Sequence, residues 1–150
     1  MRNIKTHGLI LFIYSNVYKI LSLIFYDLFY NSNLLIYLNP LITFGFFYLW
    51  YYYGYHNKLG FKYGLNIGII GSIDGIICSI LSMKFLIEPD SSSLWFMYLW
   101  MKPLNFIIQH LSFSGISNFV PQISVIIVIL LTGIGGYIGK CKSLSDDCKL

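Results

Sequence analysis

This chain contains few charged residues. Of its 150 residues only 11% are Asp, Glu, Lys or Arg, whereas a soluble domain carries roughly 25%. No charged residue occurs between Lys102 and Lys140, and none occurs from Leu28 to Tyr55. A helix needs about 20 mainly apolar residues to cross the hydrocarbon core of a bilayer, and both runs are longer than that. The composition excludes an ordinary soluble domain and predicts a membrane protein.

Other absences exclude further classes of protein. The net charge of +4 is spread over the flanks of the apolar runs, so the clustered basic face of a nucleic-acid-binding protein is missing. The three cysteines, Cys78, Cys141 and Cys148, form no C-x-x-C pair, which argues against a disulfide framework. What the chain does contain is 57% hydrophobic residues, with a mean hydropathy of +0.69.

Four apolar runs predict four membrane-spanning helices. A further segment, about 94–113, is apolar enough to cross but carries Lys102-Pro103 in its middle, so we expect it to lie in the interface or to re-enter the membrane. The chain is then a single all-α membrane domain, 1–150, folded as a helical bundle with a cytoplasmic tail at 140–150. The alternative has five transmembrane helices, with 94–113 crossing. The four expected spans are about 8–30, 34–55, 63–83 and 119–139.

Basic residues distinguish between these topologies. With four spans, seven basic residues outside the spans share one side and two lie on the other, whereas five spans remove the bias. The positive-inside rule therefore favours four spans with both termini in the cytoplasm. The seven are Arg2, Lys5, Lys58, Lys62, Lys140, Lys142 and Lys149, and the two are Lys84 and Lys102.

Two charges fall inside expected spans. Lys19 and Asp74 are each the twelfth residue of their helix, and both helices cross in the same direction, so the two charges are expected at one level near the midplane. Because an unpaired charge there costs at least about 2.5–3.5 kcal/mol, we expect them to pair, either as part of an ion path or as a structural link. Asp27 lies near the outer end of its helix, at the level of Lys84, and is expected to form an ion pair near the surface.

Glycines recur at helical spacing in two spans. Residues three and four apart share one helix face, so the third span presents a smooth stripe on which another helix backbone can pack closely. The last span repeats this pattern. The predicted packing residues are Gly64, Gly68, Gly71 and Gly75 in the third span and Gly135 and Gly139 in the last.

The remaining polar and aromatic residues do not predict a cofactor or metal site. His7 and His56 fall on the cytoplasmic side and could approach each other, while His110 falls on the outer side, and a zinc site needs three or four ligands. The tyrosine run at 51–53 points in every direction around a helix, so it is typical of an interfacial aromatic belt more than of a ligand cage.

The sequence favours a small, non-catalytic, multi-pass membrane protein that packs against itself or a membrane protein partner through its glycine faces. Its surroundings would be the lipid bilayer, and no nucleic-acid partner is expected. The alternative is a small oligomeric transporter or channel that uses Lys19, Asp27 and Asp74. A membrane enzyme comes third, because no convergent acid, base or nucleophile is evident.

Overall fold

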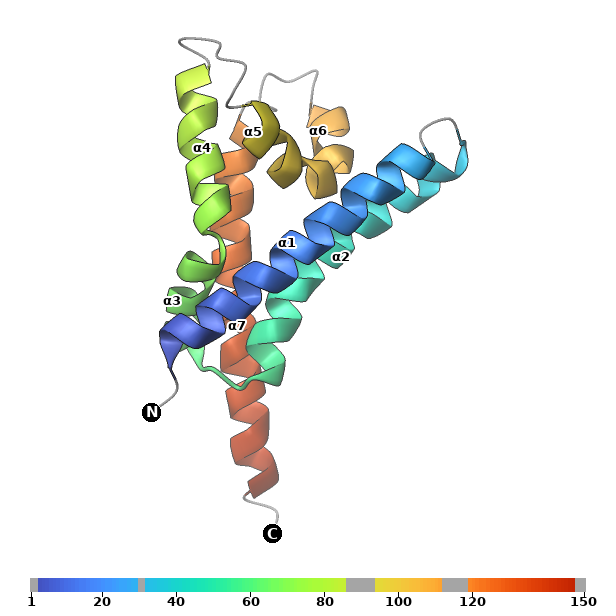
Figure 1. Ribbon diagram of the computed structural model, residues 1–150. Coiled ribbons are helices and arrows are strands. Elements are labelled where there is room, and N and C mark those ends of the chain that lie inside the picture. The colour runs from blue at the N-terminus through green and yellow to red at the C-terminus, as the bar shows by residue number, and fades with distance from the viewer. Residues whose placement is uncertain (1–2, 30–31, 86–93, 112–118, 148–150) are drawn as a thin grey trace. The chain divides into compact units, whose positions relative to one another are not determined.

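The computed structural model describes residues 3–29, 32–85, 94–111 and 119–147, with side chains except at 83–85, 94–97 and 146–147. In this part of the chain every regular element is a helix (Figure 1). The elements are α1 (Ile4–Leu28), α2 (Leu34–His56), α3 (Phe61–Gly71), α4 (Ile73–Phe85), α5 (Leu94–Met101), the 3-10 turn η2 (Lys102–Leu104), α6 (Asn105–Leu111) and α7 (Val120–Asp147).

Three helices, α1, α2 and α7, are each long and apolar enough to cross a membrane. Helices α3 and α4 reach that length only together, as a bent pair, so the described residues contain three such helices, or four if the pair is one span. The predicted fold class, an all-α protein with membrane-length helices consistent with a bundle, is therefore confirmed.

The third expected span is broken near its middle. Helix α3 ends at Gly71, Ser72 donates its backbone N–H to the carbonyl of Gly68 at 3.0 Å, and α4 begins at Ile73. Gly/Ser pairs are a common site of helix kinks, because glycine has no side chain to pack and serine competes for backbone hydrogen bonds. The break places the N-terminus of α4 inside an apolar run, with Asp74 in its first turn.

Helix α2, Leu34–His56, covers the run expected as the second span, with Pro40 in its interior although proline has no N–H with which to continue the helical pattern. Helix α7 continues past residue 139 as far as Asp147. The expected tail is therefore helical over 140–147.

The core holds polar as well as apolar residues, and many large apolar residues are exposed. Lys19 and Thr132 are 0% exposed and Thr43 is 1% exposed, whereas Leu28 and Tyr37 are each 75% exposed. Charged and polar residues of a soluble domain are mostly on its surface. This distribution suits a bundle whose outer surface meets hydrocarbon and whose polar groups must be satisfied inside.

The chain forms two compact units, each assembled from segments that are distant in the sequence. The first unit comprises Met1–Ser15, Phe47–Ile73 and Ile126–Leu150. The second comprises Asn16–Phe46 and Asp74–Val125. Helices α1, α2 and α7 each contribute residues to both units.

In the first unit the backbones of α2, α3 and α7 approach closely. A methyl group on Gly64 of α3 would lie 2.5 Å from the carbonyl oxygen of Thr132 on α7, and one on Gly54 of α2 would overlap the same oxygen. The backbone N–H of Gly60 donates to the carbonyl of Gly136 at 2.9 Å. Close backbone packing through small residues is the usual way in which helices associate in lipid.

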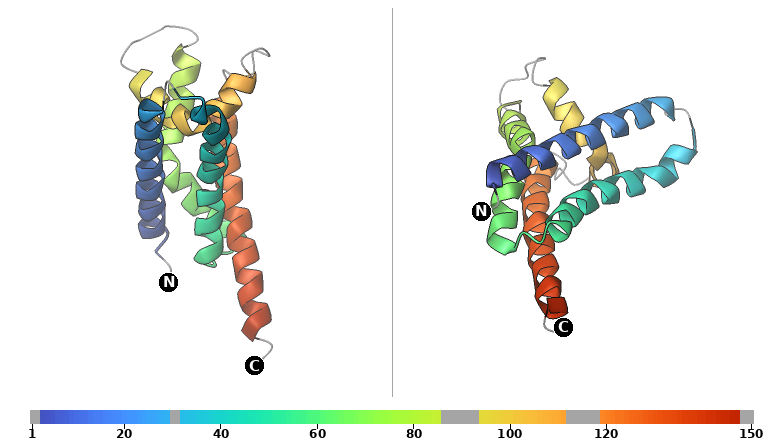
Figure 2. Two further views of the ribbon diagram at one scale, coloured as in Figure 1. Left: turned by 90° about the vertical axis from the view of Figure 1, so that its right-hand side faces the viewer. Right: turned by 60° about the horizontal axis from the view of Figure 1, so that its bottom comes forward.

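In the second unit α1 and α2 run in opposite directions (Figure 2). The Tyr18 hydroxyl of α1 donates to the carbonyl of Ile42 on α2 at 2.7 Å. In the short segment α5–η2–α6 the interior positions are Trp100 of α5, 1% exposed, and Leu104 of η2, 0% exposed, whereas α6 has no buried residue. The 3-10 turn η2 is fixed to α2 by the Thr43 hydroxyl, which donates to the carbonyl of Pro103 at 2.6 Å.

Candidate functional site

The structure brings Lys19 and Asp74 together in an ion pair inside the second unit. The Lys19 ammonium on α1 donates to Oδ2 of Asp74 on α4, and the side chain of Lys19 is 0% exposed while that of Asp74 is 19% exposed. Neither Lys19 nor Asp74 is therefore left without an opposite charge in an apolar interior, an arrangement that would lower the stability of the fold.

Asp74 is stabilised further by its place in α4. It lies in the first turn of that helix, and its Oδ1 accepts the backbone N–H of Gly75 at 3.0 Å. The first N–H groups of a helix have no partner within the helix, and they carry a partial positive charge that favours a carboxylate. The break at Ser72 thus creates the helix end that holds the acidic member of the pair.

Trp100 of α5 is the second partner of Lys19. The ammonium lies 4.7 Å from the centre of the indole ring, within the range of a cation–π interaction. The same ring packs edge-on against Phe46 of α2, with centroids 5.6 Å apart, and its Nε1–H donates to Oγ of Ser124 on α7 at 2.9 Å. Trp100 therefore joins elements from five parts of the chain, since it also lies against Gly75 of α4. We call Lys19, Asp74, Trp100 and Ser124 the Lys19 cluster.

Amide and hydroxyl groups complete the polar interior of this unit. The Tyr26 hydroxyl donates to Oδ1 of Asn39, whose Nδ2 donates to Oε1 of Gln109 at 3.1 Å. Between α7 and α4, Nε2 of Gln122 donates to Oγ of Ser82 at 2.7 Å. Hydrogen bonds of this kind hold helices together in lipid, which offers no competing hydrogen-bond partner.

Asp27 is not part of the Lys19 cluster. It is exposed near the end of α1, eight residues beyond Lys19, which is about 12 Å along the helix axis. Its expected partner, Lys84, has a side chain outside the described part of the chain. On the same face of α1, Ser15, Ser22 and Tyr26 are buried, whereas Asn16 is half-buried.

The predicted packing glycines contact different neighbours. In the first unit Gly64 and Gly68 lie against the backbone of α7 at Thr132 and Ile129, and Gly71 lies against the side chains of Leu11 and Trp50. Gly135 and Gly139 lie against the backbone carbonyls of Tyr51 and Tyr55 on α2. In the second unit Gly75 lies against the Trp100 ring. All six positions are therefore used for packing within the chain.

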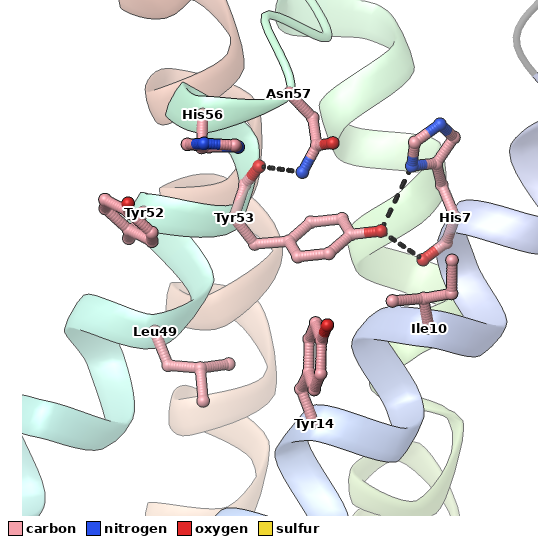
Figure 3. A pocket seen from close by; sticks show the side chains of 8 residues that line it. All are labelled: His7, Ile10, Tyr14, Leu49, Tyr52, Tyr53, His56 and Asn57. Carbon is pink, nitrogen blue, oxygen red and sulfur yellow. Dashed lines mark hydrogen bonds between the residues drawn. The ribbon is translucent and has the colours of Figure 1, made fainter.

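A cavity of about 580 Å³ lies in the first unit between the start of α1 and the end of α2 (Figure 3). Its lining includes His7 and His56, which the sequence predicts on the same side of the membrane, and Tyr52 and Tyr53 of the expected aromatic belt. Tyr53 is only 7% exposed, so it is an interior residue instead of a belt residue. The polar and aromatic lining residues are His7, Tyr14, Tyr52, Tyr53, His56 and Asn57.

One hydrogen-bonded pair orders this cavity. The Tyr53 hydroxyl donates its single proton to the carbonyl of His7 at 3.0 Å and lies 3.1 Å from Nδ1 of the same residue. With its proton donated to the carbonyl, the hydroxyl can accept from the ring in the tautomer of His7 that carries its proton on Nδ1. Among the described residues no three His, Cys, Asp or Glu side chains gather as a metal site.

Sequence reasoning missed Trp100, Ser124 and the bond between His7 and Tyr53. Trp100 lies in the segment 94–113, which was expected at the membrane interface. Tryptophan is common there, so the composition of that segment gave no sign that Trp100 lies in the interior. The only related signal is Gly75, whose missing side chain makes room for the ring.

Comparisons of this chain with protein-family models, with curated proteins and with solved structures found no match.

Proposed function

We propose that this protein is a small, non-catalytic, multi-pass membrane protein that associates with a second copy of itself or with another membrane protein. Both termini lie in the cytoplasm in this proposal, as the distribution of basic residues favours. Its role is that of an accessory subunit within the bilayer.

The pairing of Lys19 inside its own chain carries this proposal. The ammonium is 0% exposed and meets Asp74 and Trp100, so its charge is neutralised by the fold itself. The glycines expected to face a partner also pack within the chain. The surface available for association is therefore the outer apolar surface of the helices. Among α1, α2 and α7, the largest exposed share belongs to α2, because only 22% of its apolar stretch is buried.

Purification in a mild detergent tests this association. The full chain, carrying an affinity tag, should elute as a defined complex larger than the monomer, either as a homo-oligomer or with one stoichiometric membrane protein. Substituting outward residues of α2, such as Phe44→Ser, should weaken the complex, whereas Ile126→Ser on the exposed surface of α7 should not. A monomer that brings no partner with it would contradict the proposal.

A small transporter or channel is the second candidate, and the broken span favours it. Transporters often place their substrate and ion sites where a membrane helix is interrupted, with helix ends directed at the ions. Here the break at Ser72 lies beside Asp74, whose side chain is 19% exposed. A carboxylate in this position could exchange its lysine partner for a proton or a cation.

Ion flux separates the two candidates. In proteoliposomes the transporter candidate requires a proton or cation flux that Asp74→Asn abolishes, whereas the accessory candidate requires no such flux. The Lys19→Met/Asp74→Asn double variant provides the complementary test, since a stable double variant that has lost its biological activity would favour transport. Full activity in the same variant would favour a structural link.

A further inference from the structure

The cavity between the start of α1 and the end of α2 is polar at one end and apolar at the other (Figure 3). His7 lies in the first turn of α1, and His56 is the last residue of α2, so both belong to the helix ends. Tyr14 is seven residues further along α1 and Leu49 seven residues back along α2, which is about 10 Å along each helix axis. The cavity therefore runs from polar groups at the helix ends to apolar groups two turns inside.

Three tyrosine rings form the walls between these two ends. Tyr14 extends from α1 and Tyr52 from α2, and the ring of Tyr53 bridges the space between the two helices (Figure 3). Tyr53 is held in place, because its ring lies edge-on to that of Tyr14 with centroids 6.3 Å apart and its hydroxyl donates to the carbonyl of His7. Aromatic rings present large, rigid, flat surfaces. A flat apolar molecule can lie against these rings without reordering them.

The hydrogen-bonding groups gather at the polar end. The side-chain amide of Asn57 donates to the carbonyl of Tyr53 at 2.9 Å, and its oxygen lies on the side of His7 (Figure 3). The imidazole rings of His7 and His56 line the same end. Amide oxygens accept, and a neutral imidazole has one donor and one acceptor nitrogen. A single hydroxyl group, which can both donate and accept, matches this set.

We propose that this cavity binds a sterol, a flat polycyclic lipid with one hydroxyl group. A sterol in a bilayer keeps its hydroxyl near the headgroups and its rings in the hydrocarbon, which is the polarity of this cavity from the helix ends inwards. Its volume of about 580 Å³ is within the usual range of ligand pockets, roughly 300–1,000 Å³. Tyr14 is 54% exposed and Tyr52 is 47% exposed, so the cavity is open at its side, where a lipid can enter.

A sequence pattern in α2 supports the same ligand class. The short motif proposed for sterol contact has Leu or Val, then Tyr, then Lys or Arg, each within about five residues of the one before. Leu49, Tyr53 and Lys58 follow one another at such spacings. The motif by itself is weak evidence. Here its leucine and its tyrosine line one cavity, which a chance match in the sequence would not require.

A quinone is the alternative flat lipid, and the cavity fits it less well. A benzoquinone ring carries carbonyl groups on opposite edges, so one oxygen would face the apolar end beside Ile10 and Leu49. An acceptor without a donor there would lose its hydrogen bond with water and gain none. The inference rests on the membrane placement proposed above but not on the association with a partner.

Photolabelling of the full chain in phosphatidylcholine nanodiscs tests this site. The probe is a cholesterol analogue with a photoreactive group on its rings, and mass spectrometry locates the label. We expect saturable labelling within 7–14 and 49–57 that unlabelled cholesterol removes and a short-chain benzoquinone does not. Equal competition by the benzoquinone would overturn the choice of a sterol. Labelling that does not saturate and follows the whole lipid-facing surface would overturn the cavity as the site.

A sterol without its hydroxyl donor tests the orientation. Because one hydrogen bond between neutral groups is worth about a fivefold change in affinity, the methyl ether of cholesterol should compete about fivefold less strongly than cholesterol. Equal competition by the two sterols would overturn the placement of the hydroxyl at the polar end.

Variants of the ring walls locate the bound sterol. Tyr14→Ala/Tyr52→Ala should weaken sterol binding about tenfold, because it removes two of the three flat surfaces. Tyr37→Ala removes the same ring from a 75% exposed position of α2 outside the lining, and should leave binding within about twofold. Equal losses in the two variants would overturn the site. If the double variant fails to fold, the single variant Tyr52→Ala decides, and unchanged labelling in it counts against the site.

This experiment is independent of the partner test. Purified protein in a nanodisc can bind a sterol without a partner, so loss of the accessory role would leave the labelling unchanged. Absence of sterol labelling would in turn leave the partner complex as it was.

Discussion

The ammonium of Lys19 has no exposed surface, so its charge is compensated entirely within the protein. Leaving a lysine unpaired at this depth would cost at least about 2.5–3.5 kcal/mol. The carboxylate of Asp74 provides the opposite charge, and the face of the Trp100 ring provides a second electrostatic contact. Removing one member of this arrangement therefore strands the other.

The pair should show strong coupling in a double-mutant cycle. We expect Lys19→Met and Asp74→Asn each to lower the free energy of unfolding by about 3–5 kcal/mol, because each leaves a buried charge or polar group without its partner. The combined variant should recover much of that loss. Folded yield and thermal unfolding in detergent measure the effect.

The control for this cycle is Asp27→Asn, which removes a carboxylate from the exposed end of the same helix. It should change the free energy of unfolding by less than about 0.5 kcal/mol, as exposed substitutions usually do. A double variant whose loss equals the sum of the two single losses would mean that Lys19 and Asp74 do not interact.

Gly75 should tolerate no larger side chain. A methyl group there would overlap Cζ2 of the Trp100 ring, which is held by Ser124 and Phe46 and cannot easily move. We expect Gly75→Ala to lower the free energy of unfolding by about 1–3 kcal/mol, the usual cost of overfilling a packed interior. Thermal unfolding measures this. Ile77→Ala, at a 45% exposed position of the same helix, should cost less, and an equal cost in both variants would contradict the placement of Trp100.

At the scale of elements, the packing glycines of α3 and α7 differ in what faces them. Gly135 lies against the backbone carbonyl of Tyr51, whereas Gly71 of α3 lies against the flexible side chain of Leu11. A backbone carbonyl can move only if its whole helix moves. A side chain can change its rotamer instead.

This difference predicts an order of stability between two similar substitutions. Gly135→Ala should separate α2 from α7 and lower the unfolding temperature clearly, with a cost of about 1–3 kcal/mol. Gly71→Ala should cost less, because its methyl group would lie 3.0–3.2 Å from side-chain atoms of Leu11 and Trp50, which need to move by only a few tenths of an ångström. Parallel thermal melts of the two variants check the order, and the reverse order would show that the contact between α2 and α7 is looser than described.

Much of the helical layout could be predicted from the sequence, because uncharged apolar runs have few other stable forms in lipid. The break at Ser72 could not be located that way, since hydropathy averaged over a span is insensitive to one Gly-Ser pair. Counting residues from the start of each expected span predicted one level for Lys19 and Asp74, and in the structure the two side chains form an ion pair. It could not reveal Trp100, whose role depends on how α5 returns into the interior of the second unit.

The same limit applies to the two cavities. His7 and Tyr53 are 46 residues apart, and only the fold brings them into contact. In the sequence, Lys58 and Lys140 were used only to predict the topology, and nothing in their spacing indicated that they line one cavity of about 390 Å³. Local patterns predict which segments are helical, but they carry no information about which helix ends meet.

For the whole molecule, the predicted topology places both ends of the chain in the cytoplasm. Reporter fusions at the N-terminus, at Lys58 and at the C-terminus should be active on the cytoplasmic side, and one at Ser92 on the opposite side, because seven basic residues against two favour this orientation. A C-terminal reporter active outside would make 94–113 a true span.

The native thiols provide an independent test of the same topology. Cys141 is exposed whereas Cys78 is buried at 0% exposure, and Cys148 lies outside the described residues. A membrane-impermeant maleimide should therefore label the chain only after the cells are permeabilised. Cys141→Ser/Cys148→Ser should abolish the labelling, and labelling of intact cells would contradict a cytoplasmic tail.

The contacts of α7 also determine when the protein can finish folding. Gly54 of α2 and Gly64 of α3 both face the Thr132 region of α7, which the ribosome makes more than sixty residues later. In the membrane placement proposed above, these helices would enter the bilayer during synthesis with their small-residue faces exposed to lipid and to other helices. A chain that stops before Val120 would keep those faces exposed, so we expect it to be degraded faster than the complete chain.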